Sequence, residues 1–328
     1  MKITVTVTAN DAGQRLDKFL TKTYRRLPQS LLYKAIRKKD IRLNGKRCDI
    51  ADRLKEGDVL SLFLPEDVLE TAPPTYEFMH ASRQLAIVYE DEHVLLLNKP
   101  VGLLVHPDDR EFTDTLIFRV QRYLYEKGEY DPAAENSFAP ALVNRIDRNT
   151  AGIVIAAKTA VALRILNDKL KNREIQKYYL CLVHGQMPRQ EDTLEGYLEK
   201  NEAQNRVYVS TQPKPGARTI RTRYRVLEHR DGLSLLEIHL LTGRTHQIRA
   251  HMASIGHPLL GDGKYGTNQQ NKGTGFNKQA LCSYRLQFDF ATPAGELDYL
   301  NGKAFSLEQV WFADAFRRGE LVSAGSSG

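Results

Sequence analysis

Strand-like segments outnumber helical ones along most of this 328-residue chain, and this balance is the strongest constraint on its fold. Apolar and β-branched runs follow one another from residue 85 to residue 290, and turn-forming residues separate them. Helical spacing is found at 115–125 and 159–170. Because most strands are joined by short turns, we expect an α+β domain with a largely antiparallel mixed sheet and flanking helices. The clearest predicted strands cover 177–184, 219–227, 233–241 and 281–290, after opening strands within 85–105.

A dense basic block lies near the N-terminus. Residues 22–47 contain ten lysines and arginines and the single acid Asp40, a net charge of +9, whereas the whole chain carries +7. A solvated face is the ordinary explanation for such charge. On a small folded module, however, it indicates the phosphate backbone of a nucleic acid as the partner. The cations that we expect to bind it are Arg25, Arg26, Lys34, Arg37, Lys38 and Lys39.

The basic block coincides with two predicted helices and a hairpin. A helical pattern begins at 15–20, Pro28 breaks it, and Ser30 can cap a second helix. Asn44-Gly45 is a strong signal for a two-residue hairpin turn, and 58–64 adds another strand. Two basic helices followed by short strands resemble an S4-like RNA-binding domain, here at about 12–65.

Prolines among acids mark the domain boundary. Residues 65–74 include Pro65, Pro73 and Pro74, a composition typical of a short stiff linker. We therefore expect a small S4-like α/β domain at 1–66, a linker at 67–80, the main domain at 81–318 and a flexible tail at 319–328.

One polar loop of the main domain combines an acid with flanking cations. The sequence Asn-Arg-Ile-Asp-Arg-Asn-Thr-Ala-Gly at 144–152 places Asp147 between Arg145 and Arg148. Positive neighbours favour the ionised carboxylate, and arginines bind phosphates well. Taken alone, these nine loop-forming residues are explained by a structural turn. The alternative is a site that both holds a polyanion and reacts with it.

Three stretches in the same order resemble the RluA-type pseudouridine synthases. The loop around Asp147 resembles that family's active-site motif, although Asn144, Ile146 and Ala151 replace its usual His, Leu and Ser. Lys-Tyr-Tyr at 177–179 and Gly-Arg-Thr-His-Gln-Ile-Arg at 243–249 resemble two further family motifs. The resemblance therefore spreads over most of the main domain, and it predicts the fold of a pseudouridine synthase catalytic domain.

The resemblance also implies an activity and a role for several residues. It implies an RNA pseudouridine synthase, an isomerase of structured RNA, with 23S ribosomal RNA as the expected substrate. In this interpretation Asp147 is the indispensable acid, Arg244 pairs with it, and Tyr179 stacks on the target uracil. Arg145 would fill the space left by a flipped base or contact phosphates. Residue identity leaves open whether Asp147 attacks C1′, attacks the base or removes a C2′ proton.

Other functions remain compatible with parts of the sequence. A non-catalytic RNA-binding or ribosome-assembly protein would need only the basic block. A nucleoside or glycoside hydrolase also cleaves at C1′, but such enzymes usually pair two carboxylates. The second carboxylate available here, Asp262, lies near a Gly-rich turn, where we expect it to support structure. Transfer RNA is the alternative substrate.

Composition limits the remaining classes. With 41% hydrophobic and 27% charged residues, the chain is typical of soluble globular proteins, and no run approaches the roughly 18 apolar residues of a membrane span. We expect a cytoplasmic monomer whose partner is RNA, with no membrane association and no obligate protein partner. Cys48, Cys181 and Cys282 are expected to be small buried hydrophobes. No metal is expected, and no cofactor, because the isomerisation adds no group and changes no oxidation state.

Overall fold

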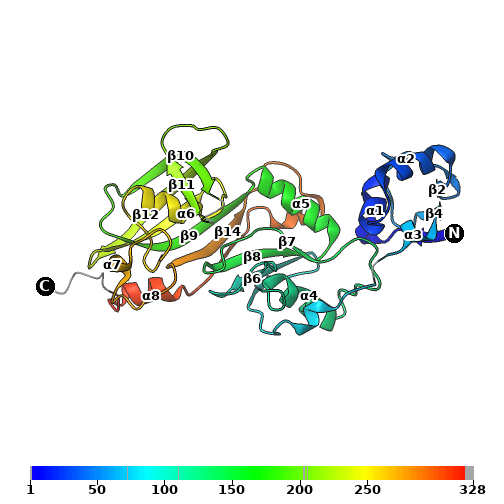
Figure 1. The fold of residues 1–328 in the computed structure, drawn as a ribbon. Coiled ribbons are helices and arrows are strands. Elements are labelled where there is room, and N and C mark those ends of the chain that lie inside the picture. Colours follow the sequence, from blue (N-terminus) through cyan, green and yellow to red (C-terminus); the bar gives the residue numbers. More distant parts are fainter. Residues whose placement is uncertain (1, 72, 110, 202–203, 205, 322–328) are drawn as a thin grey trace.

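The N-terminal residues form a small sheet with its own core in the computed structural model, which describes residues 2–71, 73–109, 111–201, 204 and 206–321 (Figure 1). Four antiparallel strands lie in the order β1-β4-β2-β3. Two helices pack on them around buried residues from Val7 to Leu69. The architecture is that expected for an S4-like domain. Its elements are β1 (Lys2–Thr6), α1 (Leu16–Thr23), α2 (Gln29–Lys38), β2 (Ile41–Leu43), β3 (Lys46–Arg47), β4 (Val59–Phe63) and α3 (Glu66–Leu69).

The turn predicted in this unit is confirmed, and the predicted helix cap is wrong. Asn44 and Gly45 have φ values of 51° and 74°, as a tight hairpin turn between β2 and β3 requires. Helix α2, however, begins at Gln29, so Ser30 lies within its first turn. Pro28 takes the capping position instead, because its ring fixes φ at −65° and the start of a helix needs no amide hydrogen there. Helix α3 adds buried side chains to this core, which therefore extends past residue 66.

The main domain is built on an eleven-stranded sheet, and the predicted α+β class is confirmed. Nine strands run in the order β11-β10-β12-β13-β9-β14-β8-β6-β5, with β15 beside β14 and β7 beside β8. Among the described strand pairs, only β14 and β8 are parallel. The strands are β5 (Ile87–Glu90), β6 (Val94–Lys99), β7 (Ala141–Leu142), β8 (Ala151–Ala157), β9 (Ile175–His184), β10 (Glu191–Asn201), β11 (Arg206–Ser210), β12 (Arg218–Arg230), β13 (Leu233–Leu240), β14 (Leu281–Phe288) and β15 (Ala304–Ser306).

Helices cover both faces of this sheet. On one face, α4 packs against β6 and β8, and α6 packs against β9 and β13. On the other face, α5 packs against β6 and β8, and α8 against β9 and β13. Ile146 contacts the cores under both α4 and α6, so the loop of Asp147 lies where the two halves of the first face meet. The helices are α4 (Leu116–Glu126), α5 (Ala160–Lys171), α6 (Gln247–Ser254), α7 (Asn268–Asn271) and α8 (Trp311–Arg317).

Direct contacts join the N-terminal unit to the main domain. The side chain of Asn10 donates a hydrogen bond to the Glu135 carboxylate at 2.7 Å, and its Oδ1 atom accepts from the backbone amide of Ala160, the first residue of α5. The buried carboxylate of Asp11 accepts from the Ser137 hydroxyl at 2.6 Å. Figure 1 shows the unit at one end of the molecule, next to α5. The basic helices are therefore held at a fixed place relative to the sheet.

Several smaller predictions can be compared with the structure. All three cysteines are buried, as expected. No helix in the described part of the chain is long and apolar enough to cross a membrane. Of the predicted tail, residues 319–321 follow α8, and 322–328 lie outside the described residues.

Candidate active site

A buried lysine fixes the loop that carries Asp147. The ammonium of Lys99, at the end of β6, donates hydrogen bonds to the carbonyl oxygens of Pro100, Leu103 and Arg148 at 2.8–3.0 Å. Burial lowers the pKa of Lys99 to about 7. The sequence interpretation missed this residue. The available signal was a lysine two positions after the apolar run 94–97, because a cation at the end of a buried strand needs acceptors.

A glycine sets the approach of the next strand. At Gly152 a Cβ atom would lie 2.2 Å from the carbonyl oxygen of Ser283, and φ is +116°. Only glycine fits both the backbone angle and the space. β8 can therefore lie directly against β14, and the loop ending at residue 150 enters the centre of the sheet.

Arg249, and not Arg244, pairs with Asp147. The Nη1 atom of Arg249 lies 3.0 Å from Oδ2 of Asp147. The same guanidinium binds Asp262 through Nε at 2.7 Å and Nη2 at 3.0 Å. Burial disfavours the charged form of Asp262, but the hydrogen bonds and positive charge of Arg249 lower the pKa of this carboxyl below its ordinary value. Asp262 thus supports structure, as predicted, by orienting the partner of Asp147.

The predicted pairing with Arg244 is wrong because of where the helix begins. Arg244 lies in the loop before α6 with an exposed side chain, and its backbone amide donates to Oε1 of Gln247. Helix α6 starts at Gln247 and buries Gln247 to Met252. Its first turn therefore brings Arg249 to Asp147. His246 takes the N-cap position of this helix in a left-handed conformation with φ 53°.

His246 is a second neighbour of Asp147 that sequence reasoning did not assign. Its Nε2 atom lies 3.8 Å from Oδ2 of Asp147, and its Nδ1 atom lies 2.9 Å from the hydroxyl of Tyr265. Burial lowers the pKa of His246, and the nearby negative charge of Asp147 opposes this effect. The spacing of three residues between His246 and Arg249 was the available signal, because such residues lie on one side of a helical turn.

Tyr179 lies in β9 on the same face of the sheet as Asp147. It packs in the core under α6 and is only 5% exposed. Burial raises the pKa of its phenol, and the charge of Asp147 adds to this rise. The preceding Tyr178 stacks on His239, with ring centroids 4.6 Å apart. The alternation of the strand thus separates the two tyrosines, and the stacking role of Tyr179 stays a prediction.

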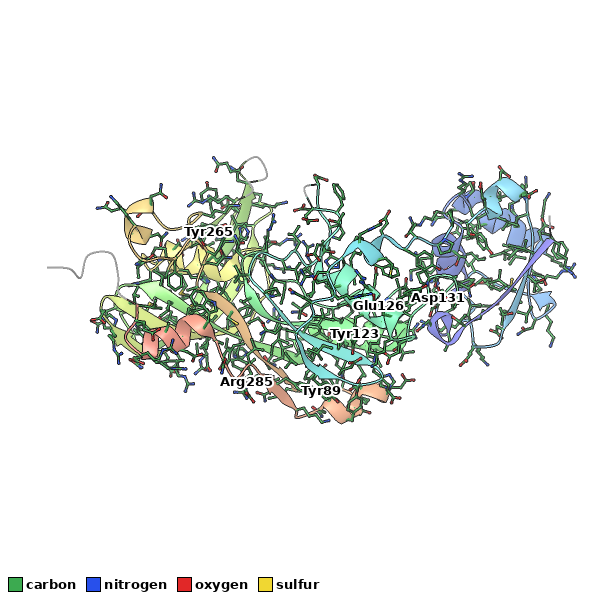
Figure 2. The ribbon with its side chains drawn as sticks, turned by 90° about the horizontal axis from the view of Figure 1, so that it is seen from below. Tyr89, Tyr123, Glu126, Asp131, Tyr265 and Arg285 are labelled. Atoms are coloured by element: carbon green, nitrogen blue, oxygen red, sulfur yellow. The ribbon has the colours of Figure 1, made fainter. Side chains whose placement is uncertain are left out.

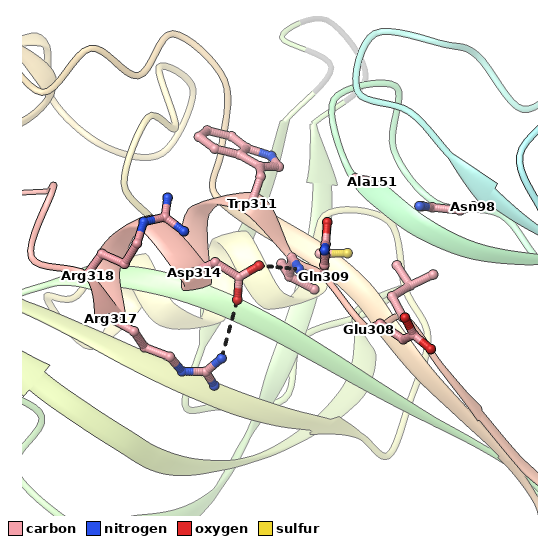
Figure 3. A pocket seen from close by; sticks show the side chains of 11 residues that line it. Asn98, Ala151, Glu308, Gln309, Trp311, Asp314, Arg317 and Arg318 are labelled. Carbon is pink, nitrogen blue, oxygen red and sulfur yellow. Dashed lines mark hydrogen bonds and ion pairs between the residues drawn. The ribbon is translucent and has the colours of Figure 1, made fainter.

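Asp147 opens into a cavity of about 350 Å³. The side chain of Asp147 is 24% exposed, so a ligand in this cavity can reach the carboxylate. A larger cavity of about 830 Å³ lies beside α8, where Trp311 and the ion pair of Asp314 with Arg317 line it (Figure 3). That cavity does not include Asp147. The smaller cavity is lined by Asp147, Arg148, Asn149, His246, Arg249, Gly261, Gly263, Lys264, Asn277 and Gln279.

The predicted RNA-binding cations are all exposed. Arg145 stands two residues before Asp147. Burial lowers the pKa of the His106 imidazole, and the positive charge of Arg145 lowers it further. Arg26 pairs with Glu70, so part of its charge is neutralised within the N-terminal unit. The remaining predicted cations of the basic block, exposed on or beside α1 and α2, are Arg25, Lys34, Arg37, Lys38 and Lys39.

Comparison with known proteins shows to which family this chain belongs. Residues 93–254 match the family model described as RNA pseudouridylate synthase. The chain is 34% identical to "Ribosomal large subunit pseudouridine synthase C" of Vibrio cholerae, over 87% of each chain. It is 35% identical to the protein of the same name from Escherichia coli K12, over 87% of this chain and 88% of that one. The chain belongs to the RNA pseudouridylate synthase family. It is therefore an RNA pseudouridine synthase, an isomerase, as the sequence predicted.

Solved structures of this family share the fold. "Human RNA Pseudouridylate Synthase Domain Containing 4" superposes with a TM-score of 0.56 at 18% identity, over 72% of this chain and 93% of that one. "Human RNA Pseudouridylate Synthase Domain Containing 1" gives a TM-score of 0.52 at 22% identity, over 77% and 99%. At these identities the likeness concerns the fold of the synthase.

Proposed function

We propose that this enzyme converts uridine to pseudouridine in the RNA of the large ribosomal subunit, and that Asp147 is the reacting residue. The observation that carries the proposal is the carboxylate of Asp147 at the mouth of a cavity, held at 3.0 Å by Arg249. The names of the bacterial relatives supply the RNA class.

The reaction sets requirements that the residues of the cavity meet. The bond between N1 and C1′ breaks, the uracil turns, and C5 joins the same sugar carbon while C5 loses a proton and N1 gains one. A carboxylate paired with one guanidinium group has one defined orientation. Asp147 can then act as a nucleophile or as a base toward the sugar, and both routes remain open.

Recognition of RNA is assigned to cations outside the cavity. The exposed guanidinium of Arg145 is available to phosphates beside the flipped nucleotide, or to the space that the base leaves. The side chain of Tyr179 supplies an aromatic surface for the uracil. We propose that the basic block on the N-terminal unit binds a second stretch of the same RNA, so that the division into an S4-like domain, a linker and a catalytic domain is also functional.

Tritium release tests this proposal. RNA transcribed with 5-tritiated uridine loses tritium when C5 bonds to the sugar, so the wild type should release it from large-subunit ribosomal RNA. Asp147→Asn should release none, and Asp147→Ala should bind RNA almost as tightly as the wild type does. Turnover by Asp147→Asn would end the assignment of that residue, and free uracil among the products would indicate a hydrolase.

The modified site requires a second measurement. Carbodiimide treatment and primer extension on RNA from cells with and without the gene should reveal pseudouridine that depends on this protein. If the pseudouridine that depends on this protein is found only in transfer RNA, transfer RNA replaces ribosomal RNA as the substrate. We propose that the enzyme acts in the cytoplasm, which the bacterial relatives named for ribosomal RNA support, and we expect it to act as a monomer.

A further inference from the structure

His246 connects the cavity to a chain of hydrogen bonds that starts on a neighbouring strand. The backbone amide of Val207, in β11, donates to the hydroxyl oxygen of Tyr265 at 3.1 Å. That hydroxyl lies 2.9 Å from Nδ1 of His246. The opposite ring nitrogen, Nε2, points toward Asp147, and His246 lines the cavity. Figure 2 labels Tyr265 beside the ribbon of this region.

These contacts favour one position for the proton of the neutral His246 ring. The oxygen of Tyr265 already accepts from Val207, and among the described residues Nδ1 of His246 is the acceptor within reach of the phenol proton. With the phenol donating to Nδ1, that nitrogen acts as the acceptor. In a neutral imidazole the proton must then be on Nε2.

Within the described part of the chain, the Nε2 proton has no acceptor at hydrogen-bond distance. Asp147 Oδ2 is 3.8 Å away, longer than the 3.2 Å or so of a real bond. Four charged groups face the ring. Asp147 and Asp262 favour the imidazolium form, whereas burial and the positive charges of Arg249 and Lys264 disfavour it. His246 is thus a neutral donor, aimed into the cavity beside the reacting carboxylate.

We infer that Nε2–H of His246 donates a hydrogen bond to the O2 carbonyl of the target uracil. This inference rests on the proposed function, since it takes uridine in RNA as the substrate. O2 is attached to the ring carbon next to N1, so it lies beside the bond that Asp147 helps to break. When that bond breaks, negative charge spreads from N1 onto O2, and a fixed donor stabilises this charge more than it stabilises the ground state.

A neutral donor suits this position better than a cation would. A second positive group beside Asp147 would compete with Arg249 for the carboxylate. Tyr265 keeps the ring oriented, and the guanidinium carbons of Arg206 and Arg249 each lie 5.1 Å from the centre of its ring. Tyr265 is therefore a positioning residue that acts through His246.

The test combines an enzyme variant with a substrate variant. His246→Asn is chosen because asparagine tolerates the left-handed backbone at this position. We expect kcat for tritium release to fall about 10- to 100-fold with KM nearly unchanged, and the melting temperature to stay within about 3 °C of the wild type. His229→Asn, at an exposed position of β12, serves as the matched control and should keep full activity.

The substrate variant isolates the predicted contact. RNA with 5-tritiated 2-thiouridine at the target carries sulfur, a weak acceptor, in place of O2. The wild type should lose about tenfold in kcat on this RNA, whereas His246→Asn should lose no more than about twofold. Equal losses in the two enzymes, or full activity of His246→Asn on normal RNA, would overturn the inference while leaving the proposed function intact. No turnover by the wild type on normal RNA would overturn both.

Discussion

Replacing Arg249 by methionine should damage both stability and catalysis, whereas the same change at Arg244 should affect neither strongly. The Asp262 side chain is fully buried, and its two strongest hydrogen bonds come from Arg249. Removing one partner of a buried ion pair costs about 3–5 kcal/mol, because the other charge remains unpaired. Backbone amides of Lys264 and Tyr265 still donate to Asp262, so we expect the lower end, about 3 kcal/mol.

Urea unfolding of the two variants measures this difference. Arg244 is exposed, so Arg244→Met should change the free energy of unfolding by no more than about 0.5 kcal/mol. The double variant Arg249→Met, Asp262→Asn removes the unpaired charge. It should recover much of the stability but no tritium release, because Asp147 still lacks its partner.

Two results would refute this reasoning. One is a stable and active Arg249→Met variant together with an inactive Arg244→Met variant, which would return the pairing to Arg244. The other is a double variant that recovers catalysis along with stability, because Arg249 would then matter only to the fold.

Three further predictions concern other parts of the chain. Because the pKa of buried Lys99 is about 7 against 10.5 for the free side chain, the unfolded chain binds more protons between these values. Stability should therefore rise as the pH increases from 7 toward 10, and urea unfolding of Lys99→Met should show a smaller rise. Gly152→Ala should lower the free energy of unfolding by more than about 3 kcal/mol, whereas Gly128→Ala, with open space around it, should cost about 1–2 kcal/mol, again by urea unfolding. Changing Arg37 and Lys38 to glutamate should weaken RNA binding in filter assays and reduce its salt dependence, while kcat at saturating RNA stays unchanged.

Local signals in the sequence predicted local structure well. Asn44-Gly45 forms the expected hairpin turn, because a tight turn needs two residues that accept positive φ. Thr115 and Thr159 stand directly before α4 and α5, close to the predicted starts. The helix cap predicted at Ser30 was wrong because proline and serine both suit the start of a helix. Only the packing of the helix selects between them.

The motifs and their order along the chain determined the family, the fold class and the residue proposed to react. Each motif is a short contiguous stretch, so it can be recognised without the tertiary structure. The sequence could not determine which arginine meets Asp147. Arg244 and Arg249 stand in the same motif, and the choice depends on α6 beginning at Gln247 and on Asp262 lying behind it. Tertiary structure decided this, because a guanidinium group more than 100 positions away reaches a carboxylate only through the packing of helix, loop and sheet.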